Sequence, residues 1–215
     1  MKPLNNIESN ISFEPMVHII DDDDAVLDSL SMLTDSIGIT NTIYSSAQLF
    51  LNTFPGATLK TLSGCIVLDI RMPGMSGLEC QQRLKELECP LPIIFITGHG
   101  DVPMAVEAIK NGALEFIQKP FREQELLDCI QRALEINRET QQLTHHALEI
   151  KTRLQSLTKR ELEVMQKVIA GDANKVIASD LSLSQRTIEI HRANVMEKMH
   201  ARSLAELVTM VLTQD

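Results

Sequence analysis

Residues 93–120, IIFITGHGDVPMAVEAIKNGALEFIQKP, have the pattern of a strand, a helix and a second strand. The first apolar run is Ile93 to Ile96, and the second is Ala113 to Ile117. Between them, apolar residues recur at helical spacing over residues 104–109. Runs that are apolar almost throughout are typical of a parallel sheet that helices cover on both faces. This stretch therefore indicates an α/β fold.

The same alternation extends toward the N-terminus. Three more apolar runs precede this stretch, at Met16–Ile20, Thr42–Tyr44 and Cys65–Leu68, and segments with helical spacing separate them. Strand and helix thus alternate five times. This predicts an α/β doubly wound, five-stranded parallel sheet of the flavodoxin-like class over residues 16–137, preceded by an N-terminal extension, residues 1–15.

The chain changes character after residue 137. Residues 138–156 are polar and lack Gly and Pro, which predicts a helical linker whose leucines are too sparse for a sound coiled-coil seam. A T-x-x-E capping box at Thr158 and a helix N-cap at Ser184 predict helices farther on. Short helices joined by a tight turn indicate a small all-α helix-turn-helix domain in residues 157–215.

Composition places both parts among folded proteins and divides their charge unevenly. The 215 residues are 44% hydrophobic and 23% charged, which is too apolar for wholesale disorder. Residues 1–137 carry 19 acidic and nine basic residues, whereas residues 157–215 carry eight of each. The asymmetry predicts two domains with different partners.

Neither a membrane span nor a cysteine framework is expected. No apolar run approaches the roughly 18 residues that cross a bilayer, and residues 1–15 lack the apolar centre of a secretory signal, so we expect a cytoplasmic protein. The four cysteines include no C-x-x-C pair, which argues against a zinc ribbon, a redox motif or a disulfide framework. We expect them to be packing residues.

Polar residues follow four of the predicted strands: Asp21–Asp24, Asp69, Thr97 and Lys119. Ligand sites of open α/β sheets lie beyond the carboxyl ends of the strands, so we expect these groups on one rim. Clustered carboxylates repel one another unless a hard cation lies among them, and Mg²⁺ suits such a site. The pattern predicts a site for a phosphoryl group, with Asp69 as the nucleophile and Lys119 and Thr97 bonding phosphoryl oxygens.

Two other interpretations of these acids stay open. Strand-end acids can be solvated or can cap helices, and Asp24 or Ser29 would suit a helix start. A phosphatase with an aspartate nucleophile usually needs an acid two residues later, where this chain has Arg71. We therefore expect no enzyme activity beyond self-phosphorylation at Asp69, and we hypothesise that Arg71 and His99 set the lifetime of the phosphoryl group.

Three motifs carry a family resemblance: VHIIDDDDAV, VLDIRMPGMSGLE and FITGHGDVPMAVEAIKNGALEFIQKPF. Through them, residues 16–137 resemble the receiver domain of bacterial two-component response regulators, particularly the FixJ/NarL type. Within the family, the motifs resemble several branches, including nitrogen-fixation, styrene and tetrathionate regulators. The segments GHGDVPMAVE and VMEKM…SLAELV slightly favour the tetrathionate branch (TtrR-like). The resemblance implies a phosphoacceptor, Asp69, a Mg²⁺ site of Asp21, Asp22, Asp69 and the Arg71 carbonyl, and switch residues Thr97, Lys119 and Phe116.

The resemblance leaves two assignments open. Because four aspartates are consecutive, the sequence does not show directly which two form the acidic pair. Counting back four residues from Val26 favours Asp22 over Asp23 as the second member. Phe116 is as consistent with a plain core residue of the fifth strand as with a switch.

The third helix of the second domain is expected to have two faces. Ile188, Val195 and Met199 would anchor it, which leaves the opposite side free to enter a major groove. Residues 157–207 resemble the LuxR-type helix-turn-helix domain over nearly its whole length. The resemblance implies base contacts from Arg186, Glu189, Ile190, Ala193 and Asn194. It implies phosphate contacts from Lys175, Thr187, His191 and Lys198.

These features together predict a two-component response regulator and DNA-binding transcription factor. A partner sensor histidine kinase would phosphorylate Asp69, and Mg²⁺ would be the cofactor. Because a neutral domain should bind DNA weakly as a monomer, we expect phosphorylation to favour a homodimer on a double-stranded DNA operator, through residues 102–111 and 114–117. Residues 204–212 are either a second dimer contact or core. The alternative is a phosphorelay or protein-interaction module whose helical domain binds protein, which the zero net charge favours.

Overall fold

The computed structural model describes residues 14–98 and 102–212. The chain divides into two compact units, an N-terminal unit that extends to Gln141 and a C-terminal unit that begins at Gln142. Each unit has a hydrophobic core of its own.

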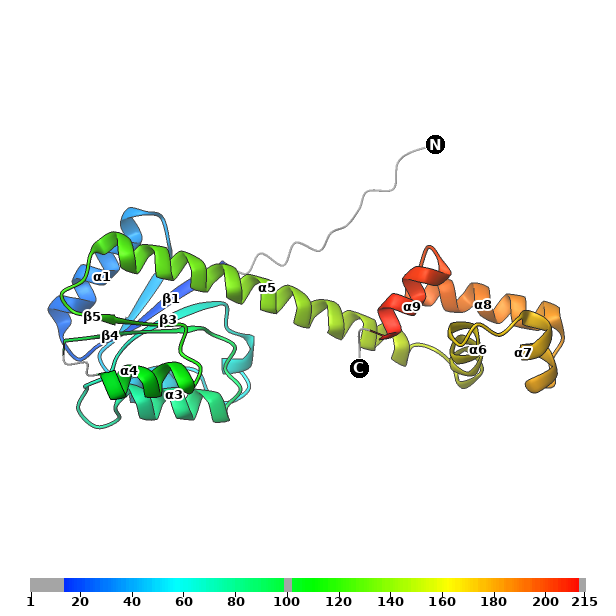
Figure 1. Cartoon of the computed structure of the whole chain (residues 1–215), viewed down its shortest axis with the longest axis horizontal. Helices are drawn as coiled ribbons and strands as arrows, with labels where there is room; N and C mark the ends of the chain where they lie inside the picture. The colour runs from blue at the N-terminus through cyan, green and yellow to red at the C-terminus, as the bar shows by residue number, and fades with distance from the viewer. Residues whose placement is uncertain (1–13, 99–101, 213–215) are drawn as a thin grey trace. The chain divides into compact units, whose positions relative to one another are not determined.

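Five parallel strands form the sheet of the N-terminal unit (Figure 1). They are β1 (Met16–Ile20), β2 (Asn41–Tyr44), β3 (Gly64–Asp69), β4 (Ile93–Thr97) and β5 (Glu115–Gln118). Their order across the sheet is β2-β1-β3-β4-β5, which is a doubly wound order and confirms the predicted fold class. The register pairs Ile20 with Leu68 and Asp69 with Ile96, so the carboxyl ends of β1, β3 and β4 share one edge.

Helices cover both faces of this sheet (Figure 1). One face carries α1 (Asp24–Ser36) and the N-terminal part of α5 (Glu123–Gln155). The other carries α2 (Ala47–Thr53), the short turn η1 (Leu59–Thr61), α3 (Gly77–Glu86) and α4 (Val102–Lys110).

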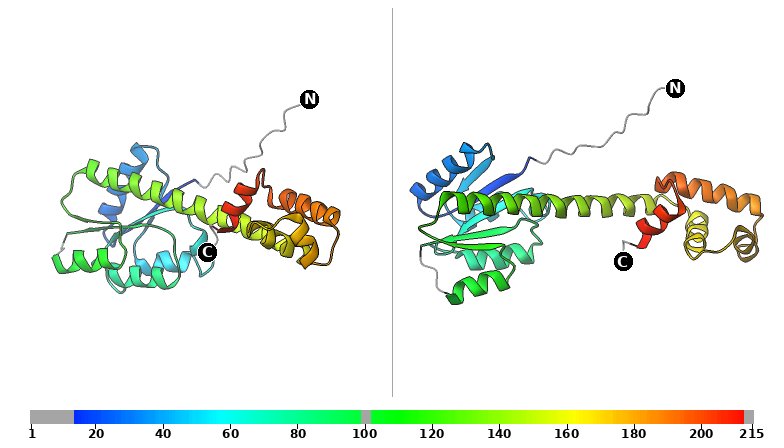
Figure 2. Two further views of the ribbon diagram at one scale, coloured as in Figure 1. Left: turned by 45° about the vertical axis from the view of Figure 1, so that its right-hand side comes forward. Right: turned by 45° about the horizontal axis from the view of Figure 1, so that its top comes forward.

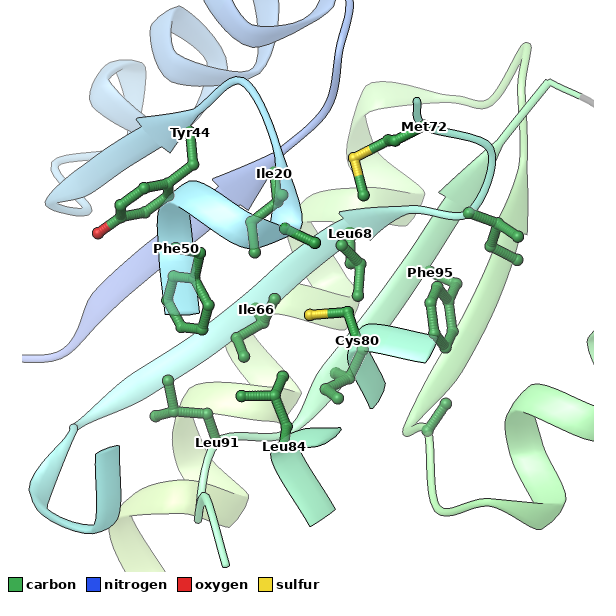
Figure 3. Close-up of a cluster of buried hydrophobic side chains, with 14 of the residues drawn as sticks. Ile20, Tyr44, Phe50, Ile66, Leu68, Met72, Cys80, Leu84, Leu91 and Phe95 are labelled. Atoms are coloured by element: carbon green, nitrogen blue, oxygen red, sulfur yellow. The ribbon is translucent and has the colours of Figure 1, made fainter. Parts of the chain in front are cut away.

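Two apolar layers hold the helices against the sheet. Because side chains alternate along a strand, Ile66 and Leu68 point to the layer under α2 and α3, whereas Val67 points to the layer under α1 and α5. Figure 3 shows Ile66 and Leu68 beside Cys80 and Leu84 of α3. Burial on both faces explains why the strands are apolar almost throughout.

The fifth strand begins later than its apolar run suggests. The run predicts a strand over Ala113–Ile117, but β5 covers Glu115–Gln118. Gly112 has φ 101° and follows the end of α4, and the Ala113 N–H donates to the Ala108 carbonyl. Ala113 therefore completes the end of the helix instead of entering the sheet.

Helix α5 continues without a break through the segment predicted as a helical linker. In the N-terminal unit, the buried side chain of Asn137 accepts the Gly64 N–H at 2.9 Å and donates to the Pro90 carbonyl at 3.1 Å. In the C-terminal unit, Ile150 is buried against Met165 and other core residues.

Among the residues of the C-terminal unit that the structure describes, four more helices follow α5: α6 (Lys159–Ile169), α7 (Asn174–Asp180), α8 (Gln185–Met199) and α9 (Leu204–Leu212). Figure 2 shows this helical unit from two further sides, in yellow to red. Thr158 and Glu161 form the predicted capping box of α6, and Ser184 caps α8 through the Thr187 N–H. Gly171, with φ 91°, follows the end of α6. The short turn between α7 and α8 makes these helices the predicted helix-turn-helix.

No helix within residues 14–98 and 102–212 is both long and apolar enough to cross a membrane. All four cysteines are free thiols, of which Cys65, Cys80 and Cys129 are buried and Cys89 is half-buried. Burial raises the pKa of Cys65 and of Cys80 to about 12. These thiols therefore stay protonated, as suits packing residues.

Candidate functional site

The carboxyl edge of the sheet brings acidic and basic side chains together. Asp21 follows β1, Asp69 ends β3, Thr97 ends β4 and Lys119 follows β5. The Lys119 Nζ donates to Asp21 Oδ2 at 2.6 Å and to Asp69 Oδ1 at 3.3 Å. One ammonium group thus bridges two carboxylates, whose side chains are only 3% and 9% exposed.

The chain that follows Asp69 makes one further hydrogen bond to its side chain and passes close to its backbone. The Arg71 backbone N–H donates to Asp69 Oδ2 at 2.6 Å. At the start of α3, the Gly77 N–H donates to the Ile70 carbonyl, and a Cβ on Gly77 would come within 2.3 Å of the Asp69 carbonyl oxygen. Position 77 therefore requires glycine. The strand-end argument misses Gly77, whose place in the segment RMPGMSG after Asp69 is a sequence signal for it.

The charges in this site oppose one another. Burial raises the pKa of Asp69, and the charge of Asp21 acts in the same direction, whereas Lys119 and the Arg71 N–H act against them. Burial also acts to lower the pKa of Lys119, but its hydrogen bond to Asp21 and the two carboxylate charges raise it overall. Asp69 is consequently a basic carboxylate beside a firmly protonated ammonium group, which suits a nucleophile that attacks an anionic phosphoryl group.

The four consecutive aspartates have different environments. The Asp21 Oδ1 accepts the Asp23 N–H at 3.0 Å, and the Asp23 side chain caps α1 by accepting the Ala25 N–H. The helix cap is therefore Asp23, not Asp24 or Ser29, and Asp24 lies in the first turn. Asp22 is exposed beside the buried Asp21.

The carboxylates present fit a hard divalent cation only in part. Within the described ranges, no group of three or more His, Cys, Asp or Glu side chains is placed to hold a metal ion. The Lys119 ammonium group is hydrogen-bonded to both Asp21 and Asp69. The two buried carboxylates and the exposed Asp22 still offer the oxygen ligands that Mg²⁺ prefers.

The remaining receiver residues singled out in the sequence lie near this edge or outside the described ranges. Thr97 is buried at the end of β4. Phe116 is half-buried in β5, pairs in register with Phe95, and packs against the core under α3 and α4. His99 lies outside the described residues.

The helix-turn-helix has a buried side and an exposed side. Ile188, Val195 and Met199 are buried, which confirms them as the anchors of α8. Four predicted base-contact residues are exposed: Arg186, Glu189, Ile190 and Ala193. Asn194, Thr187 and His191 are half-buried, and Lys175 on α7 is exposed.

The basic side chains of the C-terminal unit fall into two groups. Lys198 pairs with Glu161 at 2.6 Å, and Arg160 pairs with Glu163 at 2.8 Å. Lys167 lies between Asp172 and Asp180. Among the described residues from 157 on, five basic side chains have no ion-pair partner: Lys159, Lys175, Arg186, Arg192 and Arg202. Of these, Lys175 and Arg186 are exposed on α7 and α8, and the exposed face of α8 also carries the acidic Glu189.

Comparison with protein families assigns both units. Residues 17–131 match the response regulator receiver domain, and residues 155–211 match the bacterial regulatory proteins of the luxR family. The chain belongs to the response regulator family. As a response regulator with a LuxR-type output domain, it is a DNA-binding transcription regulator.

Bacterial response regulators align with most of this chain, across both units. The response regulator is 47% identical over 193 residues to TodT of Pseudomonas putida, covering 90% of this chain and 83% of TodT. It is 45% identical over 196 residues to FixJ of Bradyrhizobium diazoefficiens, covering 91% and 94% of the two chains. The structure of the response regulator StyR matches with a TM-score of 0.86 at 42% identity, over 93% of this chain and 99% of StyR. The tetrathionate branch stays a prediction.

Proposed function

We propose that this response regulator accepts a phosphoryl group on Asp69 from a sensor histidine kinase. The observation that carries the proposal is the bridge from Lys119 to both Asp21 and Asp69 at the carboxyl edge of the sheet. It supports the proposal because a buried carboxylate beside a positive charge is the arrangement that phosphoryl transfer needs.

In the proposed reaction, an Asp69 carboxylate oxygen attacks the phosphorus of a phosphohistidine. A phosphorus–oxygen bond forms, the phosphorus–nitrogen bond breaks, and the bonding electron pair stays on the histidine nitrogen, which takes a proton from solvent. Lys119 stabilises the negative oxygens of the phosphoryl group, and the Arg71 N–H holds the Asp69 carboxylate in place.

Asp21, Asp22, Asp69 and the Arg71 carbonyl are the residues that would hold Mg²⁺. When bound, Mg²⁺ supplies positive charge that offsets the repulsion between the phosphoryl group and the acidic side chains. The further roles proposed for this edge are a switch role for Thr97, whose hydroxyl bonds a phosphoryl oxygen, and for Phe116, which turns inward after it.

The second half of the proposal concerns DNA. Arg186, Glu189, Ile190, Ala193 and Asn194 of α8 contact bases in the major groove, and Lys175, Thr187 and His191 contact phosphates. Their support is the exposure of most of this face and the absence of ion-pair partners for Lys175 and Arg186 among the described residues. Phosphorylation favours a homodimer through α4 and β5, which pairs two such faces on one operator.

Mass spectrometry of the intact chain tests the phosphorylation step. Wild-type protein incubated with acetyl phosphate and Mg²⁺ is expected to gain one phosphoryl group, which hydroxylamine removes because an acyl phosphate is labile. Asp69→Asn should gain none, and Asp28→Asn, an exposed aspartate on α1, is the matched control that should behave as wild type. Equal labelling of Asp69→Asn and wild type would contradict the proposal.

A further inference from the structure

Lys198 lies near the C-terminal end of α8 and its side chain reaches α6. The Lys198 Nζ donates to Glu161 Oε2 at 2.6 Å and to the Ser156 carbonyl oxygen at 3.3 Å. The Glu161 side chain is 5% exposed and the Lys198 side chain 35% exposed. A buried carboxylate is stable only with a cation and hydrogen bonds around it, and Lys198 supplies the cation.

The same carboxylate is part of the capping box of α6. Glu161 Oε2 also accepts the Thr158 N–H at 2.8 Å. One buried oxygen therefore ties the start of α6 to the end of α8. The hydrogen bond from Lys198, followed by that from the Thr158 N–H, lowers the pKa of Glu161 to about 2, so the carboxylate stays charged at neutral pH.

Lys198 lies at one border of the exposed face of α8. At about 100° per residue it is roughly 120–140° around the helix from Arg186 and Ala193, but only about 40° from Asn194. Its hydrogen bonds to Glu161 and to the Ser156 carbonyl direct its side chain toward α6. Arg192 makes a second tie, because its Nη1 donates to Asn174 Oδ1 at 2.5 Å at the start of α7. Basic side chains of α8 thus join it to both neighbouring helices.

We propose that Lys198 and Glu161 form a positioning pair that fixes the recognition helix α8 on α6, and that Lys198 does not contact a DNA phosphate. This assignment departs from the phosphate role that the LuxR resemblance implies for Lys198. The inference rests on the DNA contacts proposed above. If it is correct, Lys175 contributes to the salt dependence of DNA binding and Lys198 does not.

The dependence of affinity on salt separates the two roles. Each phosphate contact that is lost makes the slope of log K against log salt shallower by about 0.9 on B-form DNA. We would measure binding of the full-length wild type, Lys198→Met and Lys175→Met to a mixed-sequence DNA duplex between about 25 and 200 mM salt. Lys175→Met is the matched control, because it removes an exposed lysine of the same unit.

Lys198→Met is expected to weaken binding at least roughly threefold and to keep the wild-type slope. Lys175→Met is expected to lose about 0.9 of the slope. Glu161→Gln, which keeps a hydrogen-bond acceptor in the capping box, should weaken binding as much as Lys198→Met, and the double variant should lose no more than either one. Thermal unfolding of each variant establishes that the folded fraction is equal.

A slope for Lys198→Met that is shallower by about 0.9 would overturn the proposal, because Lys198 would then contact a phosphate. Unchanged affinity in Lys198→Met would overturn it as well. An experiment without DNA distinguishes a failure of this inference from a failure of the proposed function. NMR titration of the Glu161 carboxyl should give a higher pKa in Lys198→Met than in wild type. If the Glu161 pKa is the same in both proteins, the pair does not exist, whatever the chain does with DNA. A wild-type chain that binds no DNA would contradict the proposed function and this inference with it.

Discussion

At the scale of single residues, the site depends on a lysine that balances two buried carboxylates. Lys119 lies within hydrogen-bond distance of Asp21 and Asp69, and its own side chain is 23% exposed. Removal of one member of such a group leaves uncompensated charge in a poorly solvated place. The same removal opens the space between the carboxylates to another cation.

Lys119→Met should therefore make the stability of the N-terminal unit depend on Mg²⁺. Without Mg²⁺, we expect a loss of about 2–4 kcal/mol in the free energy of unfolding, because two like charges stay buried together. Millimolar Mg²⁺ should recover most of this loss and should stabilise the variant more than wild type. Thermal unfolding with and without Mg²⁺ measures both effects.

The matched control is Lys60→Met, because Lys60 pairs with Glu88 and both side chains are more than half exposed. It should change stability little and leave the response to Mg²⁺ as in wild type. An equal response to Mg²⁺ in Lys119→Met and wild type would count against a cation site between Asp21 and Asp69.

A second residue with a clear pH signature is His18 in β1. It is 2% exposed, its Nδ1 lies 3.2 Å from the Tyr44 hydroxyl, and the rings of Phe50 and Phe54 surround it. Burial lowers the pKa of His18 from 6.5 to about 4. The folded chain therefore binds fewer protons than the unfolded chain in this range, so this contribution to stability is complete above pH 6.5 and is lost as the pH falls toward 4.

His18→Phe should remove that pH dependence. Between pH 7 and pH 4, wild type should lose about 3 kcal/mol more than the variant, since each pKa unit corresponds to about 1.4 kcal/mol. Urea unfolding followed by the fluorescence of Tyr44 reports on this core, because the chain has a single tyrosine and no tryptophan. Parallel pH profiles for the two proteins would show that His18 is not buried in its neutral form.

The residues that could be predicted from the sequence are those whose place depends on strand order alone. Asp21 and Lys119 follow strands and Asp69 ends one, so a parallel sheet brings them together. The pairing of Lys198 with Glu161 could not be predicted, because the two residues lie 37 positions apart and meet only through helix packing. The need for glycine at position 77 could not be predicted for a similar reason, since it follows from the close approach of Gly77 to the Asp69 carbonyl.

At the scale of elements, α5 is anchored to the sheet by a polar side chain. Asn137 is 1% exposed, accepts the Gly64 N–H and donates to the Pro90 carbonyl. Gln141 adds a hydrogen bond at 2.7 Å to the Leu62 carbonyl. These bonds satisfy one backbone group at the first residue of β3 and two in the segments that precede β3 and β4.

Asn137→Ala should destabilise the N-terminal unit by about 2–3 kcal/mol, because it leaves a buried N–H and a carbonyl without partners. Glu139→Ala, an exposed change on the same helix, should stay within about 0.5 kcal/mol of wild type. Urea unfolding followed by Tyr44 fluorescence measures both variants. Equal stability of the two would mean that water replaces the Asn137 bonds at no cost.

Helices and strands were predicted best where periodicity and caps agree. The capping box at Thr158 and the cap at Ser184 mark the starts of α6 and α8 as the structure has them. The start of β5 was misplaced because an apolar run does not show that Ala113 closes α4 by a bond to Ala108. The unbroken length of α5 was not evident either, since no sequence signal joins its apolar first part to its polar second part.

At the scale of the whole molecule, the N-terminal and C-terminal parts of the chain differ in net charge. The first 137 residues are strongly acidic, and residues 157–215 are neutral overall. In the C-terminal unit, ion pairs such as those of Arg160 and Lys167 account for much of the acidic charge. On α7 and α8, Lys175 and Arg186 are exposed, and they are two of the cations that we propose to contact DNA.

We propose that phosphorylation of Asp69 controls DNA binding. The most direct test is selection of genomic DNA fragments by the full-length protein, with and without beryllofluoride plus Mg²⁺, where beryllofluoride takes the place of the phosphoryl group on Asp69. Wild type should enrich one palindromic sequence with beryllofluoride and much less without it, and Asp69→Asn should not respond. Equal enrichment by wild type in both conditions, or a full response by Asp69→Asn, would contradict the claim.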